Sequence, residues 1–352
     1  AAGASPAGPG EFTKRAFLNG KLTLTQAEAV MDIISAGSQG AGRAALALRD
    51  GALYKKIRKI TEDLTALESH LAAWSDYPEE DVPELSDEAV STVLKEADSV
   101  LKRLISTYDA GRIIREGAVT VIAGKPKVGK STLMNLLSGR DRSIVTSVAG
   151  TTRDVVEESV LVGDVPIRLL DTAGIRETDD VVERIGVDMA QSALDRCDAV
   201  IAVFDSSAPL DDDDRRLIEK LKNRPVIAVI NKSDLEQQAD ADYIKSNFEY
   251  CVTISAAKGD GEDEFREALG KLLKTADLDP AEPVMANERQ LDCARRGEKA
   301  LAEGIEALES GMTLDAVGIC IETALDALYE LTGEKASEAV IEQVFSRFCV
   351  GK

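Results

Sequence analysis

A glycine-rich segment with the spacing G-x-x-x-x-G-K-S, residues 124–131, constrains this chain more than any other feature. It follows an apolar, β-branched run, residues 118–123, and precedes residues 132–137, whose apolar side chains have helical spacing. Strand, glycine loop and helix together predict a phosphate-binding loop, in which backbone N–H groups and a helix N-terminus face phosphate oxygens. We expect Lys130 to reach the β- and γ-phosphates and the Ser131 hydroxyl to ligate Mg²⁺.

Composition narrows the class of protein. The 352 residues carry a formal net charge of −21, which argues against a whole-surface binder of DNA or RNA but leaves a local basic patch open. No run of 18 apolar residues is present, so we expect no membrane span. The five cysteines are scattered without a C-x-x-C pair, which favours a reduced, cytoplasmic protein.

The order of patterns predicts an α/β domain between helical segments. Residues 118–275 alternate short apolar strands with helical stretches, which predicts a mostly parallel sheet with helices on both faces and one antiparallel edge strand. Helical patterns occupy the chain on both sides of this region. We expect a P-loop α/β domain inserted into one all-α helical domain, with two separate helical domains as the alternative. The predicted parts are residues 1–113, 114–277 and 278–352.

The first helical part carries two local signals. Thr25 with Glu28 three residues later predicts a capping box at a helix start. From residue 41 to residue 73 the pattern stays helical. The apolar residues along one face of that stretch are Leu53, Ile57, Ile60, Leu64, Leu67 and Leu71.

A second motif, N-K-S-D at residues 231–234, predicts which base is bound. It directly follows the apolar strand 226–230. The Asp234 carboxylate can accept hydrogen bonds from guanine N1–H and the exocyclic amine, which adenine does not offer in that arrangement. We expect backbone N–H groups of residues 255–257, after the next strand, to complete the base pocket.

Two motifs between these sites have the order found in GTPases. In D-T-A-G, residues 171–174, we expect Asp171 to hold Mg²⁺ through water and the Gly174 N–H to contact the γ-phosphate. Thr152 lies where a first switch belongs and can give Mg²⁺ a second hydroxyl. Ile175 follows D-T-A-G where Ras-like proteins have a water-orienting glutamine, so another group must orient water.

Residues 150–154 and 171–177 resemble the Era-like branch of translation-factor GTPases. Residues 9–21, residues 26–29 and the C-terminal residues 345–352 look like those of the tRNA-modification GTPase family MnmE, also called TrmE. The resemblance covers residues 9–352. It implies a GTP hydrolase that acts with the FAD protein MnmG to form the carboxymethylaminomethyl group on wobble uridine of tRNA. It also implies homodimerisation through the GTPase domains, driven by the GTP cycle.

Other functions stay open beside this resemblance. One is an Era- or EngA-like ribosome-assembly GTPase, although those proteins lack the motifs at residues 17–21 and 349–352. The other is a GTP-dependent scaffold with little hydrolysis.

The resemblance also assigns residues outside the phosphate loop. Glu183 matches the family's water-orienting glutamate, with a solvated carboxylate as the alternative. Lys21 and Lys352 match positions that contact a tetrahydrofolate derivative, in a site left incomplete because the family's N-terminal folate domain is missing. We therefore expect residues 1–8 to mark a truncation. Cys349 matches a cysteine needed for tRNA modification, with a buried core cysteine as the alternative.

Potassium is the one cofactor on which this chain departs from the family. The resemblance implies a K⁺ ion held by a phosphate-loop asparagine and by a loop matching residues 146–151. Lys127 occupies the asparagine position here. An ammonium group cannot ligate K⁺, so we expect K⁺ dependence to be weak or absent.

The expected site residues can be grouped by role. The expected catalytic residues are Lys130, Thr152, Gly174 and Glu183. The expected GTP- and GDP-binding residues are Lys127, Val128, Gly129, Lys130, Ser131, Thr132, Thr146, Ser147, Val148, Ala149, Gly150, Thr151, Thr152, Asp171, Thr172, Ala173, Gly174, Asn231, Lys232, Asp234, Ser255, Ala256 and Ala257. The expected metal ligands are Ser131 and Thr152 for Mg²⁺, and Thr146, Val148 and Thr151 for K⁺.

Overall fold

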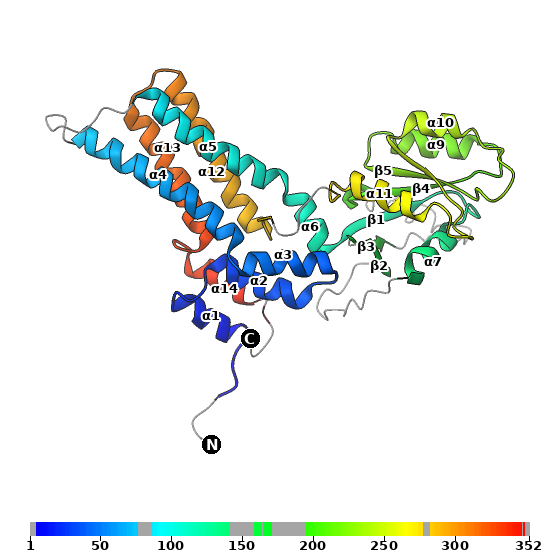
Figure 1. The fold of residues 1–352 in the computed structure, drawn as a ribbon, viewed down its shortest axis with the longest axis horizontal. Coiled ribbons are helices and arrows are strands. Elements are labelled where there is room, and N and C mark those ends of the chain that lie inside the picture. The colour runs from blue at the N-terminus through cyan, green and yellow to red at the C-terminus, as the bar shows by residue number, and fades with distance from the viewer. Residues whose placement is uncertain are drawn as a thin grey trace, which may run out of the picture. The chain divides into compact units, whose positions relative to one another are not determined.

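The chain divides into two compact units, one helical and one α/β (Figure 1). The computed structural model describes residues 5–76, 86–140, 158–163, 165–170, 194–276, 282–346 and 348. The helical unit comprises residues 1–36, 41–112 and 279–352, and the α/β unit comprises residues 37–40 and 113–278. Because the helical unit is built from chain on both sides of the α/β unit, the expected fold class of an inserted α/β domain is confirmed.

A six-stranded sheet forms the centre of the α/β unit. Its strands run in the order β2-β3-β1-β4-β5-β6, and every neighbouring pair is parallel except β2 with β3. The expected single antiparallel edge strand is thus β2. The strand bounds are β1 Ala118–Ala123, β2 Glu158–Val162, β3 Val165–Leu170, β4 Ala199–Asp205, β5 Val226–Asn231 and β6 Tyr250–Thr253.

Helices cover both faces of this sheet. All six residues of β5 and the first six of β4 are buried, which explains why these strands read as unbroken apolar runs. Helices α7 (Lys130–Arg140) and α11 (Glu262–Leu272) pack on one face, and α9 (Asp212–Leu221) and α10 (Ala241–Asn247) pack on the other. The carboxyl ends of the central strands therefore meet at one edge, where ligand loops are found in such sheets.

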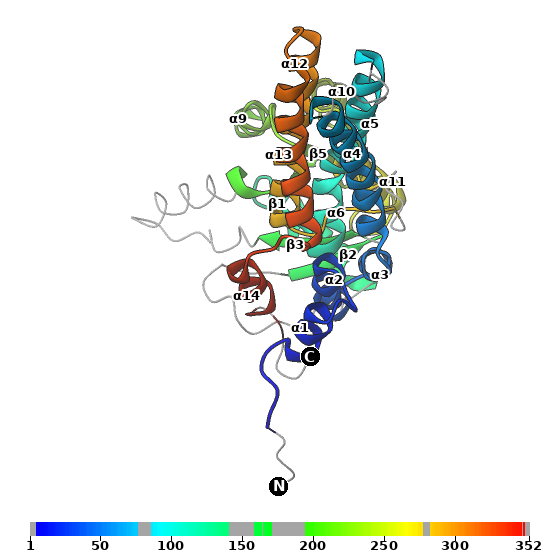
Figure 2. The same ribbon diagram turned by 90° about the vertical axis from the view of Figure 1, so that its left-hand side faces the viewer.

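Four long helices lie side by side in the helical unit (Figures 1 and 2). Shorter helices come before, between and after these four along the chain. No helix in the described part of the chain is long and apolar enough to cross a bilayer. The helix bounds are α1 Glu11–Leu18, α2 Leu24–Ser35, α3 Gln39–Arg49, α4 Ala52–Asp76, α5 Asp87–Ser106, α6 Tyr108–Glu116, α12 Glu288–Glu309, α13 Leu314–Thr332 and α14 Glu338–Ser346.

The helical stretch predicted for residues 41–73 is two helices rather than one. It breaks between α3 and α4, where Gly51 adopts a φ of 83° that residues with a side chain rarely adopt. The predicted apolar face on α4 is confirmed, because all six of its leucine and isoleucine residues are buried in the helical core.

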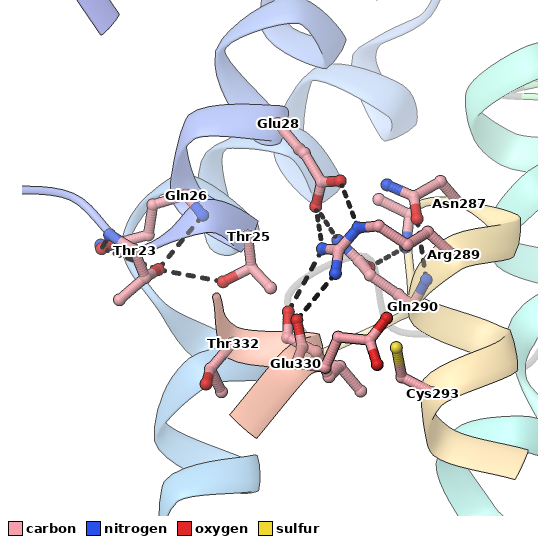
Figure 3. Close-up of polar contacts among 12 residues, drawn as sticks. Thr23, Thr25, Gln26, Glu28, Asn287, Arg289, Gln290, Cys293, Glu330 and Thr332 are labelled. Atoms are coloured by element: carbon pink, nitrogen blue, oxygen red, sulfur yellow. Dashed lines mark hydrogen bonds and ion pairs between the residues drawn. The ribbon is translucent and has the colours of Figure 1, made fainter. Parts of the chain in front are cut away.

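The capping box at the start of α2 lies two residues earlier than predicted. Thr23 is the N-cap, its hydroxyl accepts a hydrogen bond from the Gln26 N–H, and the Gln26 side chain accepts one from the Thr23 N–H (Figure 3). Thr25 and Glu28 have the same spacing but lie inside the helix. Glu28 is buried instead, so its carboxylate needs partners from elsewhere in the chain.

Those partners come from α12 (Figure 3). The Arg289 guanidinium donates to both oxygens of Glu28 at 3.0 and 2.9 Å, and the Gln290 amide donates to Oε2 at 2.6 Å. The same guanidinium donates to the carbonyl oxygens of Glu330 and Leu331 at the end of α13. One buried charged group therefore ties α2, α12 and the carboxyl end of α13 together.

Replacement of Arg289 by Met should destabilise the helical unit strongly. The substitution leaves the Glu28 carboxylate, whose side chain is 7% exposed, without its counter-charge, and we expect a loss of about 3–5 kcal/mol. The single tryptophan, Trp74 on α4, reports unfolding of this unit by fluorescence in urea.

The matched control is Arg103→Met in the same unit. Arg103 pairs with Glu282 but is 70% exposed, so its loss should cost under about 1 kcal/mol. Equal losses for the two variants would contradict the role given to the buried pair.

Candidate functional site

The phosphate loop connects β1 to α7 and has no room for a side chain at either glycine of the G-x-x-x-x-G-K-S motif. A Cβ on Gly124 would lie 2.5 Å from the Val203 carbonyl oxygen of β4. A Cβ on Gly129 would lie 2.2 Å from the Asn231 side-chain nitrogen. Both glycines have positive φ, at 152° and 101°. The loop backbone therefore packs directly on its neighbours, as a loop that presents N–H groups to a ligand must.

Lys130, at the start of α7, points back over the loop. Its ammonium donates to the carbonyl oxygens of Gly124 and Lys125 at 2.6 and 2.7 Å. Both acceptors are neutral, and burial lowers the pKa of Lys130. A phosphate group bound here would supply the anionic acceptor that this half-buried cation lacks, so the residue fits the role expected of it. Ser131 and Thr132 follow on the exposed side of α7.

Asn231 joins the phosphate loop to the loops after β5 and β6. Its amide nitrogen donates to the Val128 carbonyl oxygen at 2.9 Å, and its amide oxygen accepts from the Ala256 N–H at 3.0 Å. The residue is 2% exposed. A buried amide with both ends engaged fixes three loops relative to one another.

The Asp234 carboxylate is held at the same edge of the sheet. The Ser255 hydroxyl donates to Oδ1 at 2.8 Å, which holds the pKa of Asp234 below its ordinary value and keeps it ionised. The Ser255 N–H donates to the Asp260 carbonyl oxygen and the Ala256 N–H to Asn231. Both of these N–H groups, which we expected to face the base, instead fix the loop.

Asp205 is a member of the site that the sequence motifs did not reveal. Lys232 has a φ of 68°, and its ammonium lies 2.5 Å from Asp205 Oδ2 at the end of β4. The other Asp205 oxygen accepts from the Ser207 N–H and hydroxyl. Burial raises the pKa of Asp205, but these hydrogen bonds outweigh burial and leave it below its ordinary value. The sequence signal that could have revealed Asp205 is an acidic residue at the end of an unbroken apolar strand.

The remaining predicted residues divide into four groups. Ala257 is exposed in the loop after β6. Lys127 is exposed in the phosphate loop, with a φ of 68°. Lys21 lines an open cavity of about 1150 Å³ within the helical unit, away from the phosphate loop in the sequence. The others lie outside the described residues: Thr146, Ser147, Val148, Ala149, Gly150, Thr151, Thr152, Asp171, Thr172, Ala173, Gly174, Glu183, Cys349 and Lys352.

Comparison with known proteins identifies the family. A profile described as the MnmE helical domain matches residues 24–349. The tRNA modification GTPase MnmE of Oceanobacillus iheyensis is 42% identical over 100% of this chain and 78% of that protein. The protein of the same name from Synechococcus sp. is 42% identical over 99% of this chain and 76% of that protein. The chain belongs to the MnmE family of tRNA modification GTPases. The resemblance drawn from the sequence is thereby confirmed, and with it the classification as a GTPase.

Solved structures add little to this assignment. Era from Aquifex aeolicus, solved with GDP and aluminium fluoride, is 31% identical and covers 52% of this chain and 66% of that one, at a TM-score of 0.34. At such a score the likeness adds nothing to the membership of the MnmE family.

Exchange of Asp234 for Asn should change which base the site accepts. The amide oxygen can still accept from the Ser255 hydroxyl, but the amide nitrogen donates where the carboxylate accepted. We expect GDP affinity to fall by about 100-fold or more, because two hydrogen bonds to a charged group are lost. Xanthosine diphosphate, which offers an oxygen in place of the amine, should bind the variant better than GDP does, as titration calorimetry can measure.

The control is Asp240→Asn in the same unit. Asp240 caps α10, and asparagine caps equally well, so nucleotide preference should not change. A variant at Asp234 that still prefers GDP would contradict the assignment of this carboxylate to the base.

Proposed function

We propose that this chain binds GTP with Mg²⁺ and hydrolyses it to GDP and phosphate. The observation that carries the proposal is the direct tie, through Asn231, between the phosphate loop and the loop that bears Asp234. This tie sets a phosphate cradle and a base acceptor in one rigid arrangement. The family membership agrees with it.

Each proposed role follows from the chemistry of its residue. Loop N–H groups from Lys127 to Thr132 hold the phosphates, Lys130 neutralises the β- and γ-oxygens, and the hydroxyls of Ser131 and Thr152 hold Mg²⁺. When bound, Mg²⁺ would further neutralise the negative charge of the phosphates. Asp171 would help to hold the Mg²⁺ ion through water, and the backbone N–H of Gly174 would contact the γ-phosphate.

Glu183 is proposed to orient the attacking water, since no glutamine follows D-T-A-G. K⁺ would be held by the segment 146–151, but an exposed Lys127 ammonium replaces one ligand and supplies positive charge itself.

We further propose that GTP turnover serves the modification of tRNA. The support is that the relatives, which match 99–100% of this chain, are tRNA modification GTPases. In this proposal the protein acts with an MnmG-like FAD protein on wobble uridine, a tetrahydrofolate derivative supplies the one-carbon unit, and Lys21 and Lys352 belong to its site. The α/β domain, residues 114–277, pairs with its copy in a second chain during the GTP cycle, while residues 1–113 and 278–352 form the helical domain.

We place the protein in the cytoplasm. The four described cysteines, Cys197, Cys251, Cys293 and Cys320, are all free thiols, as suits a reducing compartment.

A GTP-dependent scaffold with little hydrolysis is the second candidate. One observation favours it: Lys127 occupies the phosphate-loop position at which the family has the K⁺-ligating asparagine. Measurable turnover separates the two candidates.

GTP hydrolysis with Mg²⁺ should proceed at comparable rates in KCl and NaCl. The reason is that the Lys127 ammonium carries a positive charge into the loop but cannot ligate K⁺. The test is to measure the rate of phosphate release in KCl and in NaCl at several protein concentrations. Lys130→Ala is the inactive control. Strong stimulation by K⁺ would refute the role given to Lys127, and GTP binding without turnover would favour the scaffold.

Replacement of Cys349 by Ser should abolish tRNA modification and leave GTP turnover intact. The thiol is proposed to serve the modification step itself, and it is not among the residues proposed to bind or hydrolyse GTP. Mass spectrometry of tRNA nucleosides, from cells that depend on this protein for the modification, measures the wobble uridine. Cys320→Ser, on α13, is the matched control and should change neither readout. Unaltered modification in the Cys349 variant would show that the thiol has no part in it.

A further inference from the structure

Lys125, the second residue of the phosphate loop, reaches out of the loop to the start of α9. Its ammonium lies 2.6 Å from Asp211 Oδ2 and 2.6 Å from Asp214 Oδ2. These two aspartates also form the capping box of α9. Asp211 Oδ1 accepts from the N–H groups of Asp213 and Asp214, and Asp214 Oδ2 accepts from the Asp211 N–H. The residues that begin α9 are therefore the residues that hold Lys125.

The buried position of Asp214 explains why its carboxylate must pair with Lys125. The Asp214 side chain is 5% exposed, and its negative charge requires a counter-charge at that depth. Burial lowers the pKa of Lys125, but the hydrogen bonds with Asp211 and Asp214 outweigh burial and leave it above its ordinary value. The hydrogen bond with Lys125 likewise holds the pKa of Asp211 below its ordinary value. Lys125 and Asp211 are thus both charged at neutral pH.

The backbone of Lys125 connects this bridge to the phosphate-binding cation. Its carbonyl oxygen accepts a hydrogen bond from Lys130 at 2.7 Å. The preceding residue, Gly124, packs on the Val203 carbonyl of β4. The first half of the loop is therefore fixed between β4 on one side and the first turn of α9 on the other.

We propose that Lys125 is a positioning residue, which fixes the first half of the phosphate loop through its bridge to Asp211 and Asp214. The bridge sets the carbonyl groups that hold Lys130, and so sets where Lys130 meets the β-phosphate. The inference rests on the proposed function, since it concerns how the same site takes a nucleoside diphosphate.

The variant Asp214→Asn distinguishes positioning by Lys125 from a simple effect of its positive charge, because the two predict opposite changes in GDP binding. If Lys125 acted only as a positive charge near the phosphates, Asp214→Asn would tighten GDP binding, because it removes a nearby negative charge. If Lys125 acts through the bridge, Asp214→Asn weakens GDP binding, because it removes one anchor. The direction of the change decides between the two.

The experiment measures GDP binding by titration calorimetry and unfolding by scanning calorimetry. Lys125→Met should weaken GDP binding by about tenfold, the change that follows from losing roughly one such anchor. Asp214→Asn should weaken it in the same direction, and Lys125→Arg should restore most of the affinity. Lys222→Met is the matched control: Lys222 follows α9 and pairs with Glu219 on the surface, so GDP binding should not change.

The double variant Lys125→Met with Asp214→Asn separates positioning from a general loss of stability. It removes the buried, unpaired carboxylate, so it should recover much of the unfolding temperature lost in Lys125→Met. GDP affinity should stay low, since the bridge is still absent.

Three results would overturn the inference. They are unchanged GDP affinity in Lys125→Met, tighter binding in Asp214→Asn, or recovery of affinity together with stability in the double variant. If the unaltered protein itself fails to bind GDP, the proposed function fails and the inference falls with it. The two failures are therefore distinguishable.

Discussion

The site depends on the side-chain amide of Asn231. One end of that amide holds the phosphate loop at Val128 and the other holds the loop after β6 at Ala256. Either group left unpaired at this depth would cost about 1–3 kcal/mol, so loop and amide stabilise each other. The approach is close enough that Gly129 can carry no side chain. The phosphate loop and the loop after β6 are consequently held in a fixed relation by the chain itself.

Features encoded by neighbouring residues could be predicted from the sequence. The central strands β4 and β5 are buried on both faces, and that burial requires the unbroken apolar runs from which they were predicted. The phosphate loop needs its two glycines because the backbone packs on Val203 and Asn231, so the motif and its geometry have one cause. In each case a few consecutive residues carry the whole signal.

Features that depend on distant residues could not be predicted in this way. Thr23 with Gln26 and Thr25 with Glu28 offer two capping boxes of the same spacing, and local rules do not choose between them. The choice is made by Arg289, which lies 261 residues from Glu28 and draws that carboxylate into the core. The pairing of Asp205 with Lys232 is of the same kind. A buried charged side chain pairs with whichever opposite charge the fold brings next to it. The spacing of residues in the sequence does not reveal that partner.

The three lysines of the phosphate loop show why environment, rather than residue type, sets a role. Lys125 lies between two carboxylates, so its charge is already compensated. Lys127 is exposed to water. Lys130 is half-buried against neutral carbonyl oxygens, and burial lowers its pKa. In the proposed site an incoming phosphate therefore gains most from Lys130, because Lys125 is already paired, Lys127 is solvated by water, and a half-buried charge interacts more strongly than an exposed one. In the role proposed for it, the bridge at Lys125 fixes the carbonyl oxygen that accepts from Lys130.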